Sequence, residues 1–252
     1  MRMDQGWQTT DMTAEPVTLT APRPIKRAIM TQWWRDLAFL HWPVDPEVVA
    51  PLLPPGTRPD TLDGVTYVGL IGFTMDRVGL GVGVPHFGHF AETNVRLYSV
   101  DAEGRRAVVF RSLDAARLLP VAIGRSLFGL NYVWSKMSVT RKPDGSYTYL
   151  SRRRWPGSGP ESSFSVVPGG PAPETPLNNF LTARWGLHTV RRGRTIYLPN
   201  EHPSWPLRTA TLTDLDETLL EAAGLPGIEG PPPSILFSLG VPVRFGAPLA
   251  SK

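Results

Sequence analysis

The stretch FAETNVRLYSV, residues 90–100, decides the fold prediction for this chain of 252 residues. Read as a strand, it points successive side chains to opposite faces. One face is largely apolar and the other carries an acid, an amide, a guanidinium and a phenol. The two faces are Ala91, Thr93, Val95 and Leu97, and Phe90, Glu92, Asn94, Arg96 and Tyr98. The first face is typical of a core, whereas the second either faces water, as antiparallel sheets commonly allow, or lines a polar cavity inside a curved sheet.

The composition is that of a globular protein built from strands and loops. Hydrophobic residues make up 41% of the chain and charged residues 19%, so it can bury a substantial core. The 27 prolines and 24 glycines interrupt the sequence at short intervals. This punctuation favours strands and loops over a helical bundle.

Several classes of protein are excluded at this level. The chain has no cysteine, which excludes a disulfide scaffold, a thiol nucleophile and a cysteine zinc site. No apolar run is long enough for a membrane-spanning helix. Residues 1–24 carry acidic side chains and lack the apolar core of a secretory signal peptide. We therefore expect a cytoplasmic protein with no membrane association, a disordered leader over residues 1–24 and a single domain over residues 25–252.

Neither nucleic acid nor metal is an expected partner. The net charge is +4, and the arginine-rich runs at residues 152–154 and 191–194 are not interleaved with stacking aromatics. These runs indicate solvated loops or strand ends rather than a nucleic-acid-binding motif. The five histidines show no metal-ligand spacing, so we predict no metal site and no cofactor.

A coarse pass along the chain predicts many strands and few helices. Asp45 and Pro46 are typical of a helix cap and first helical position. Strands are expected at 65–75, 90–100, 107–113, 131–140, 146–154 and 234–245, and helices at 45–53, 114–129, 177–185 and 216–223. The count of roughly ten strands against a few helices predicts an α+β fold with a mostly antiparallel sheet and flanking helices.

Six separated motifs together resemble one family. In order, they are HWPVDP at 41–46, LLPPG at 52–56, DG and YVG at 63–69, ETNVRLY at 92–98, SLDAA at 112–116 and FLTARW at 180–185. They resemble the YqjF-like proteins of the uncharacterised DUF2071 family, which is grouped with the acetoacetate decarboxylase-like superfamily. The resemblance implies a curved, β-barrel-like sheet around an internal cavity, with the polar face of residues 90–100 turned inward.

The superfamily also implies a chemistry. Its decarboxylases use a lysine that forms an imine with the substrate, and burial or a neighbouring cation lowers the pKa of that amine. Lys136 is the matching candidate, on a strand face with Trp134 and Tyr132. Where the decarboxylases carry two adjacent lysines, this chain has Ser135-Lys136-Met137. Glu92 matches their acid on the preceding strand.

Two hypotheses from different classes follow. In the first, the protein is an enzyme, a decarboxylase-like or imine-forming lyase that acts on a small keto acid or carbonyl compound. Lys136 and Glu92 would be catalytic, and the residues that contact the substrate would be Asn94, Arg96, Tyr98, Trp134 and Arg184. In the second, the same cavity only binds a small ligand. Arg184 could either stack on an aromatic ring or bind a substrate carboxylate, and the sequence allows a homo-oligomer.

Overall fold

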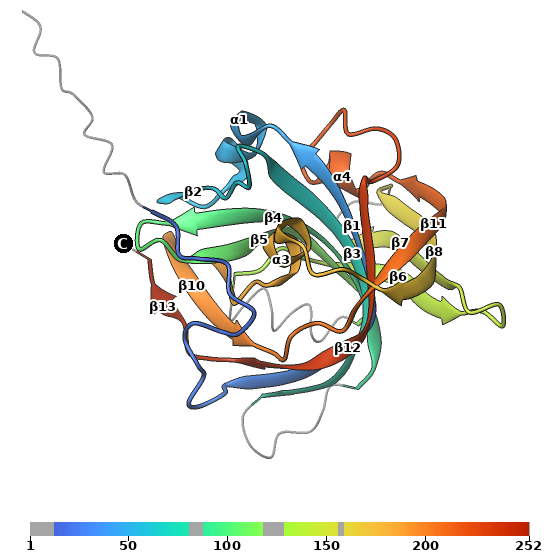
Figure 1. Ribbon diagram of the computed structural model, residues 1–252, viewed down its shortest axis with the longest axis horizontal. Helices are drawn as coiled ribbons and strands as arrows, with labels where there is room; N and C mark the ends of the chain where they lie inside the picture. Colours follow the sequence, from blue (N-terminus) through green and yellow to red (C-terminus); the bar gives the residue numbers. More distant parts are fainter. Residues whose placement is uncertain (1–12, 81–87, 118–128, 156–158, 252) are drawn as a thin grey trace, which may run out of the picture.

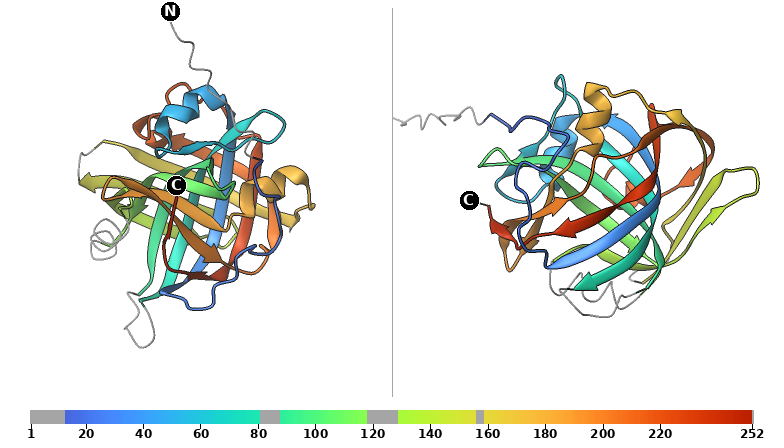
Figure 2. Two further views of the ribbon diagram at one scale, coloured as in Figure 1. Left: turned by 90° about the vertical axis from the view of Figure 1, so that its left-hand side faces the viewer. Right: turned by 60° about the horizontal axis from the view of Figure 1, so that its bottom comes forward.

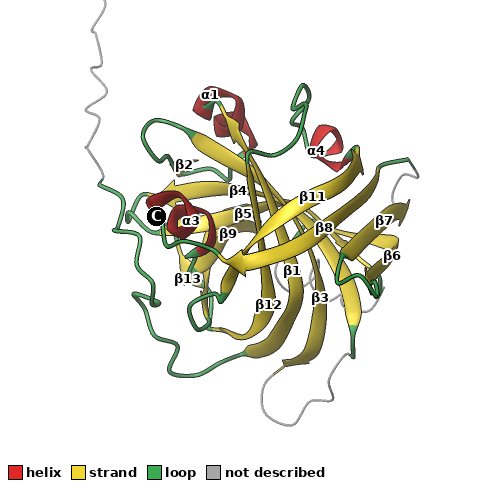
Figure 3. Ribbon diagram, turned by 45° about the vertical axis from the view of Figure 1, so that its right-hand side comes forward, coloured by secondary structure: helices red, strands yellow, loops and turns green. Residues whose placement is uncertain are grey.

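Strands dominate the computed structural model, which describes residues 13–80, 88–117, 129–155 and 159–251 (Figure 1). The strands are β1 Met30–Val44, β2 Thr57–Pro59, β3 Thr66–Leu80, β4 Phe90–Asp101, β5 Arg106–Ala115, β6 Tyr132–Arg141, β7 Tyr147–Trp155, β8 Glu161–Pro171, β9 Gly186–Arg191, β10 Arg194–Glu201, β11 Leu207–Glu217, β12 Ser234–Phe245 and β13 Leu249–Ala250. The helices are short: α1 Pro46–Val49, the 3-10 helix η1 Ala50–Leu52, α3 Pro176–Thr182 and α4 Leu219–Ala222. They lie outside the strands (Figure 3).

The described strands pair antiparallel except at β5, which runs parallel to both β6 and β9. This strand forks the sheet, because residues 113–115 pair with β6 and Val108 pairs with β9. β12 forks in the same way: residues 236–238 pair with β11 and residues 244–245 pair with β10. A mixed barrel of nine strands therefore closes through β5-β6-β7-β8-β11-β12-β1-β3-β4, and a second ring closes through β9 and β10.

β4, one of the strands shared by both rings, is buried on both faces. All twelve residues of β4 are buried. Val95 and Leu97 belong to an apolar core inside the nine-strand ring, together with Tyr149 and Phe164. The opposite face of β4 points into the second ring. The alternation of the two faces in residues 90–100 is therefore confirmed. Neither face of β4 is exposed to solvent, because β6, β7, β8 and β11 cover the face that an open sheet would expose.

Local sequence signals account for two of the helices. Asp45 caps α1 by accepting a hydrogen bond from the Glu47 amide at 2.8 Å, and Pro46 occupies the first turn. Thr175 caps α3 in the same manner, with Pro176 following it. Both patterns combine a side-chain acceptor with a proline that has no amide hydrogen to satisfy.

Two expectations differ from the structure. The helix expected at 114–129 does not begin at Asp114, which with Ala115 instead ends β5; residues 118–128 lie outside the described residues. Of the leader expected to be disordered, residues 13–24 run along the outside of the barrel (Figure 2), and residues 1–12 are not described.

The segment 13–24 is held by an internal ion pair and by hydrogen bonds to the barrel that composition does not reveal. Glu15 accepts hydrogen bonds from both terminal nitrogens of Arg23, at 2.6 and 2.8 Å, and one from the Arg106 amide at 3.0 Å. The indole of Trp185 donates to the carbonyl of Thr18 at 2.9 Å.

Among the described residues, no helix has the length and apolar character needed to span a membrane.

Candidate functional site

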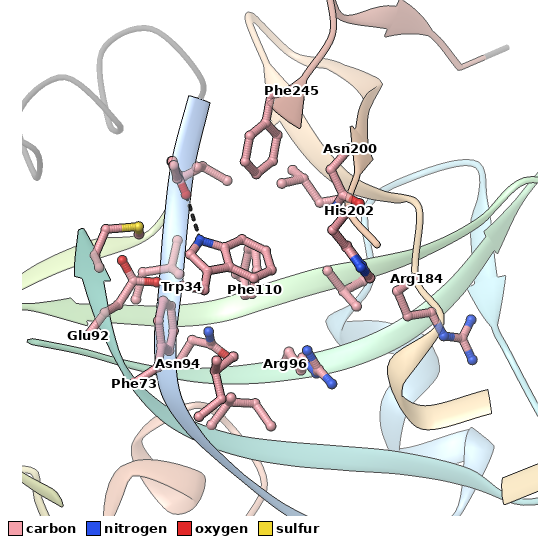
Figure 4. Close-up of a pocket in the computed structure, with 18 of the residues that line it drawn as sticks. Trp34, Phe73, Glu92, Asn94, Arg96, Phe110, Arg184, Asn200, His202 and Phe245 are labelled. Atoms are coloured by element: carbon pink, nitrogen blue, oxygen red, sulfur yellow. Dashed lines mark hydrogen bonds between the residues drawn. The ribbon is translucent and has the colours of Figure 1, made fainter. Parts of the chain in front are cut away.

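The second ring encloses a cavity of about 60 Å³ (Figure 4). Its lining comes from β1, β3, β4, β5, β9, β10, β12 and the start of β6, together with the end of α3 and residues that follow α3 and β10. Aromatic and aliphatic side chains form most of the wall, and the polar lining residues are Gln32, Glu92, Asn94, Arg96, Tyr132, Thr182, Arg184, Asn200 and His202. Since one water molecule needs about 10–15 Å³ of such space, the cavity fits a ligand of only a few non-hydrogen atoms.

Three polar residues follow one another along one face of β4. Glu92, Asn94 and Arg96 alternate with the core residues Thr93 and Val95, and all three line the cavity (Figure 4). Their two-residue spacing on a strand places neighbours about 6–7 Å apart. The row therefore presents an acid, an amide and a cation to the same small space.

Glu92 is a protonated acid at neutral pH. Its side chain is 2% exposed, and burial raises the pKa of the carboxyl to about 8, with the charge of Asp114 adding in the same direction. The Tyr132 hydroxyl donates to Oε2 of Glu92 at 3.3 Å, which opposes the rise without cancelling it. At pH 7 the carboxyl can therefore donate a proton or a hydrogen bond into the cavity.

Arg96 is a buried cation held only by neutral oxygens. Its Nε donates to the Tyr98 hydroxyl at 3.1 Å and its Nη2 donates to the Leu181 carbonyl at 2.9 Å. The guanidinium also lies over the ring of Phe39, 5.5 Å from its centre. Within the described part of the chain, no carboxylate forms an ion pair with Arg96, Glu92 on the same strand face included.

Arg184, the second guanidinium at the cavity, has a carboxylate partner. It forms an ion pair with Asp60, which also pairs with Arg106. Arg184 stacks on the rings of Phe180 and Tyr98, at 4.3 and 4.7 Å. The guanidinium therefore stacks on aromatic rings, as one of the two alternatives predicted, and the carboxylate that it contacts in the structure is the protein's own Asp60.

Tyr98 lies behind the cavity wall rather than on it. Its hydroxyl donates to the Leu181 carbonyl at 3.0 Å and receives the Arg96 hydrogen bond, and it lies 2.7 Å from Nε2 of His41. Burial, followed by the charges of Arg96 and Arg184, lowers the pKa of His41 well below its usual value. Tyr98 therefore contacts Arg96 from behind the cavity wall.

An aromatic cluster closes the side of the cavity opposite β4. The Trp34 indole donates to Oε1 of Gln32 at 2.7 Å and stacks with Trp205 at 6.0 Å. His202 lies between Trp185 and Trp205, with ring centres 4.5 and 4.8 Å away. Burial lowers the pKa of His202 to about 4, so the ring is neutral at pH 7.

Several buried polar atoms at the cavity have no hydrogen-bond partner. They are Oδ1 of Asn94, Oδ1 of Asn200 and Nη2 of Arg184. Buried polar groups are normally satisfied. These three atoms therefore lack the partner that a buried polar atom usually has. No group of three or more potential metal ligands occurs among the residues that the structure describes.

Lys136 and Trp134, predicted to share the site, lie outside it. Lys136 is exposed on β6 beside Arg152, in a hollow formed with β7 and β8, and Trp134 packs under the guanidinium of Arg154 at 4.9 Å. The face they share with Tyr132 is as expected, but β6 leaves the cavity wall after Tyr132. Four residues further, about 13 Å along the strand, Lys136 has passed beyond the cavity.

The predicted site is thus brought together in part. Glu92, Asn94, Arg96 and Arg184 meet at the cavity, Tyr98 supports them from behind, and Lys136 and Trp134 are elsewhere. Sequence reasoning missed Trp34, Asn200, His202 and Trp205. These residues come from two places far apart in the chain, residue 34 and residues 200–205, and none sits in a motif whose spacing indicates a site.

Comparison with known proteins agrees with this architecture. The profile of the DUF2071 family, described as an uncharacterized conserved protein, matches residues 31–242. The uncharacterized protein YqjF of Bacillus subtilis (strain 168) is 29% identical over 204 residues, which cover 78% of this chain and 82% of YqjF.

Solved structures share the fold at low identity. Acetoacetate decarboxylase from Legionella pneumophila aligns with a TM-score of 0.61 and 14% identity, covering 100% of this chain and 99% of that one. The enduracididine biosynthesis enzyme MppR in complex with pyruvate aligns with a TM-score of 0.60 and 14% identity, covering 88% and 90%. An acetoacetate decarboxylase-like enzyme from Sphingomonas wittichii RW1 gives a TM-score of 0.60 and 11% identity, covering 89% and 93%.

Proposed function

The chain belongs to the DUF2071 family, and we propose that its barrel cavity binds a small organic acid, with the carboxylate of the ligand paired to Arg96. The observation that carries the proposal is the state of that side chain. Arg96 is 9% exposed, lines the cavity and is hydrogen-bonded only to a phenol and a backbone carbonyl. A buried charge is costly unless it is paired, so an anionic ligand would supply the missing partner.

The rest of the cavity fits the remainder of such a ligand. The volume of about 60 Å³ admits an acid of a few carbon atoms, and the wall offers aromatic rings to its apolar part. The neutral carboxyl of Glu92 can donate a hydrogen bond to a carbonyl group, and the unpartnered Oδ1 of Asn94 can accept one from a hydroxyl group. The complex of MppR with pyruvate offers a precedent of this size on a similar fold.

Imine chemistry through Lys136 is not part of the proposal. An imine requires a desolvated amine within reach of the bound carbonyl, whereas Lys136 is exposed and outside the cavity. Lys26 and Lys142, the other described lysines, are also exposed.

Calorimetry with matched ligands tests the proposal. We expect pyruvate or lactate to bind and their uncharged amides not to bind. Arg96→Met, which keeps the packing of the stem, should weaken acid binding by about 10- to 100-fold because a charge-assisted hydrogen bond is lost. Arg152→Met serves as the control, since Arg152 is exposed at the distant hollow. Equal binding of the acid and its amide, or unchanged binding to Arg96→Met, would contradict the proposal.

Borohydride reduction in the presence of pyruvate tests the lysine route separately. The intact mass of the wild-type protein should not change. An adduct that forms on the wild-type protein and is absent from Lys136→Ala would instead support the hypothesis of an imine-forming enzyme.

A second candidate function rests on Glu92. A carboxyl with a pKa of about 8 inside a cavity can exchange a proton with a bound carbonyl compound near neutral pH. Its carboxylate form would take a proton from the carbon next to the carbonyl group, giving an enolate, and then return a solvent-derived one. In D₂O, deuterium should enter the methyl group of pyruvate at a rate that rises with pH through about 8, and Glu92→Gln should abolish this. Absence of exchange above the uncatalysed rate leaves a binding protein.

A further inference from the structure

Trp205 lines both the cavity and a second hollow. The second hollow has a volume of about 370 Å³ and lies between α3 and the segment 202–206, with Leu19 of the N-terminal segment at its edge. The two spaces share three lining residues, namely Thr182, His202 and Trp205. Of these, Trp205 has the largest side chain.

The indole of Trp205 packs against aromatic side chains of the cavity wall, one of them stacked and the other edge-on. It stacks on Trp34 with an angle of 14° between the rings and meets Phe39 edge-on at 5.4 Å. Its Nε1 donates one hydrogen bond, to the Thr182 carbonyl at the end of α3, at 3.0 Å. The ring thus spans from α3 to β1 across the boundary of the two spaces.

We infer that Trp205 determines ligand size by ending the cavity at its indole, so that acids longer than a few carbon atoms are refused. This inference rests on the proposed binding of small acids and adds the residue that limits their length. Removal of the indole joins about 60 Å³ to about 370 Å³. An acid anchored at Arg96 could then extend its chain into the second hollow, where Ala172, Pro173 and Leu207 offer apolar surface.

The test is a length series of straight-chain 2-oxo acids with three, six and eight carbons, titrated into the wild-type protein and Trp205→Leu. The wild-type protein should bind the three-carbon acid best. Each methylene that gains an apolar environment contributes roughly fourfold to a binding constant. The six-carbon acid should therefore bind at least tenfold more tightly to Trp205→Leu than to the wild-type protein, while the three-carbon acid changes by less than about threefold. Trp205→Phe guards against a folding defect and should give an intermediate profile.

Trp42→Leu is the matched control. Like that of the half-buried Trp205, the Nε1 of the buried Trp42 donates to a backbone carbonyl at 3.0 Å, but Trp42 packs in the core of the nine-strand ring. Its removal should leave the length profile of the wild type. The inference is overturned if Trp205→Leu has that same profile, or if the wild-type protein binds the six-carbon acid as tightly as the three-carbon acid.

A parallel series of primary alcohols separates the two proposals, because an alcohol needs no cation. A length effect of Trp205 on alcohols without any acid binding would discard the proposed function and keep the role of Trp205. Acid binding that depends on Arg96 but not on position 205 would keep the proposed function and discard the role of Trp205 in limiting ligand length.

Discussion

The Tyr132 hydroxyl and Glu92 Oε2 form a 3.3 Å hydrogen bond that joins the start of β6 to β4 at one end of the cavity. The bond favours the ionised carboxylate, yet burial outweighs it and raises the pKa of Glu92 to about 8. Burial also raises the pKa of Tyr132 well above its usual value, with the charge of Glu92 adding to the rise. The pair is therefore neutral at pH 7 and becomes anionic at Glu92 in mildly alkaline solution.

This pair predicts that the protein loses stability as the pH rises. The pKa of Glu92 is about 8 in the folded protein and near its ordinary value of 4.5 in the unfolded chain. Its protonated form therefore stabilises the fold fully below pH 4.5, and this contribution is lost as the pH rises from 4.5 through about 8. Glu92→Gln, which is neutral at every pH, should become more stable than the wild type by a few kcal/mol at pH 9.

Urea denaturation of both proteins between pH 4.5 and 9 measures this difference. Glu229→Gln at an exposed loop position is the control and should follow the wild type. A Glu92→Gln variant whose stability relative to the wild type is independent of pH would mean that the carboxyl ionises as freely in the fold as in the unfolded chain.

His202 predicts an opposite response to acid. Its pKa is lowered from 6.5 to about 4, mainly by burial. The neutral ring stabilises the fold above pH 6.5, and this contribution is lost as the pH falls from 6.5 through about 4, at a cost of about 2–3 kcal/mol. His202→Gln should reduce the acid sensitivity in that window, whereas His89→Gln, at an exposed position, should not. Thermal unfolding at pH 7 and at pH 4.5 is sufficient, and equal losses in all three proteins would count against a buried neutral His202.

Tyr98 predicts a link between stability and ligand binding. Its hydroxyl accepts from Arg96 and donates to Leu181, which leaves His41 to donate through Nε2. Tyr98→Phe removes a hydrogen-bond partner from Arg96, from the Leu181 carbonyl and from His41. The variant should lower the free energy of unfolding by about 1–3 kcal/mol. It should also weaken acid binding, since the guanidinium of Arg96 loses one of its anchors.

The control for this variant is Tyr67→Phe. Tyr67 is half-buried, and its hydroxyl forms no hydrogen bond within the described part of the chain, so its loss should change stability by less than about 0.5 kcal/mol. If Tyr98→Phe bound the acid as tightly as the wild type, Arg96 would not depend on this hydroxyl for its position.

The sequence predicted the parts of the site that lie on one strand. Residues 90–100 alternate strictly, so the row of Glu92, Asn94 and Arg96 could be recognised from spacing, and the family resemblance gave its inward direction. The same reasoning failed at Lys136, because a shared face says nothing about how far along a strand the cavity extends. Trp205 and His202 could not be predicted, since the segment 202–206 has no periodicity and its position depends on how β10 and β11 diverge from β12.

The fork of the sheet also could not be predicted from the sequence. Parallel pairing of β5 with both β6 and β9 joins residues far apart in the chain, and it depends on pairing of only residues 113–115 and Val108. Each of these short contacts leaves no alternation pattern of its own. The prediction of a mostly antiparallel sheet therefore holds, while the way in which the two rings share β5 and β12 required coordinates.

Asp114, at the end of β5, gives the last prediction because it acts on both stability and Glu92. It is fully buried and accepts hydrogen bonds from Arg153 at 3.0 Å, Ser135 at 2.9 Å and Ser151 at 3.2 Å. Asp114→Asn leaves the Arg153 cation buried without its counterion, which should cost about 3–5 kcal/mol. The charge of Asp114 also helps to raise the pKa of Glu92, so that pKa should fall in the variant.

Urea denaturation measures the first effect and carboxyl-carbon NMR titration of Glu92 the second. Glu161→Gln is the matched control: Glu161 pairs with Arg152 at 3.7 Å, but both side chains are more than half exposed. It should change stability by less than about 1 kcal/mol and leave the pKa of Glu92 unchanged. A large loss of stability in Asp114→Asn with no fall in that pKa would mean that burial alone keeps Glu92 protonated, and the cavity acid would then be independent of the charge network behind it.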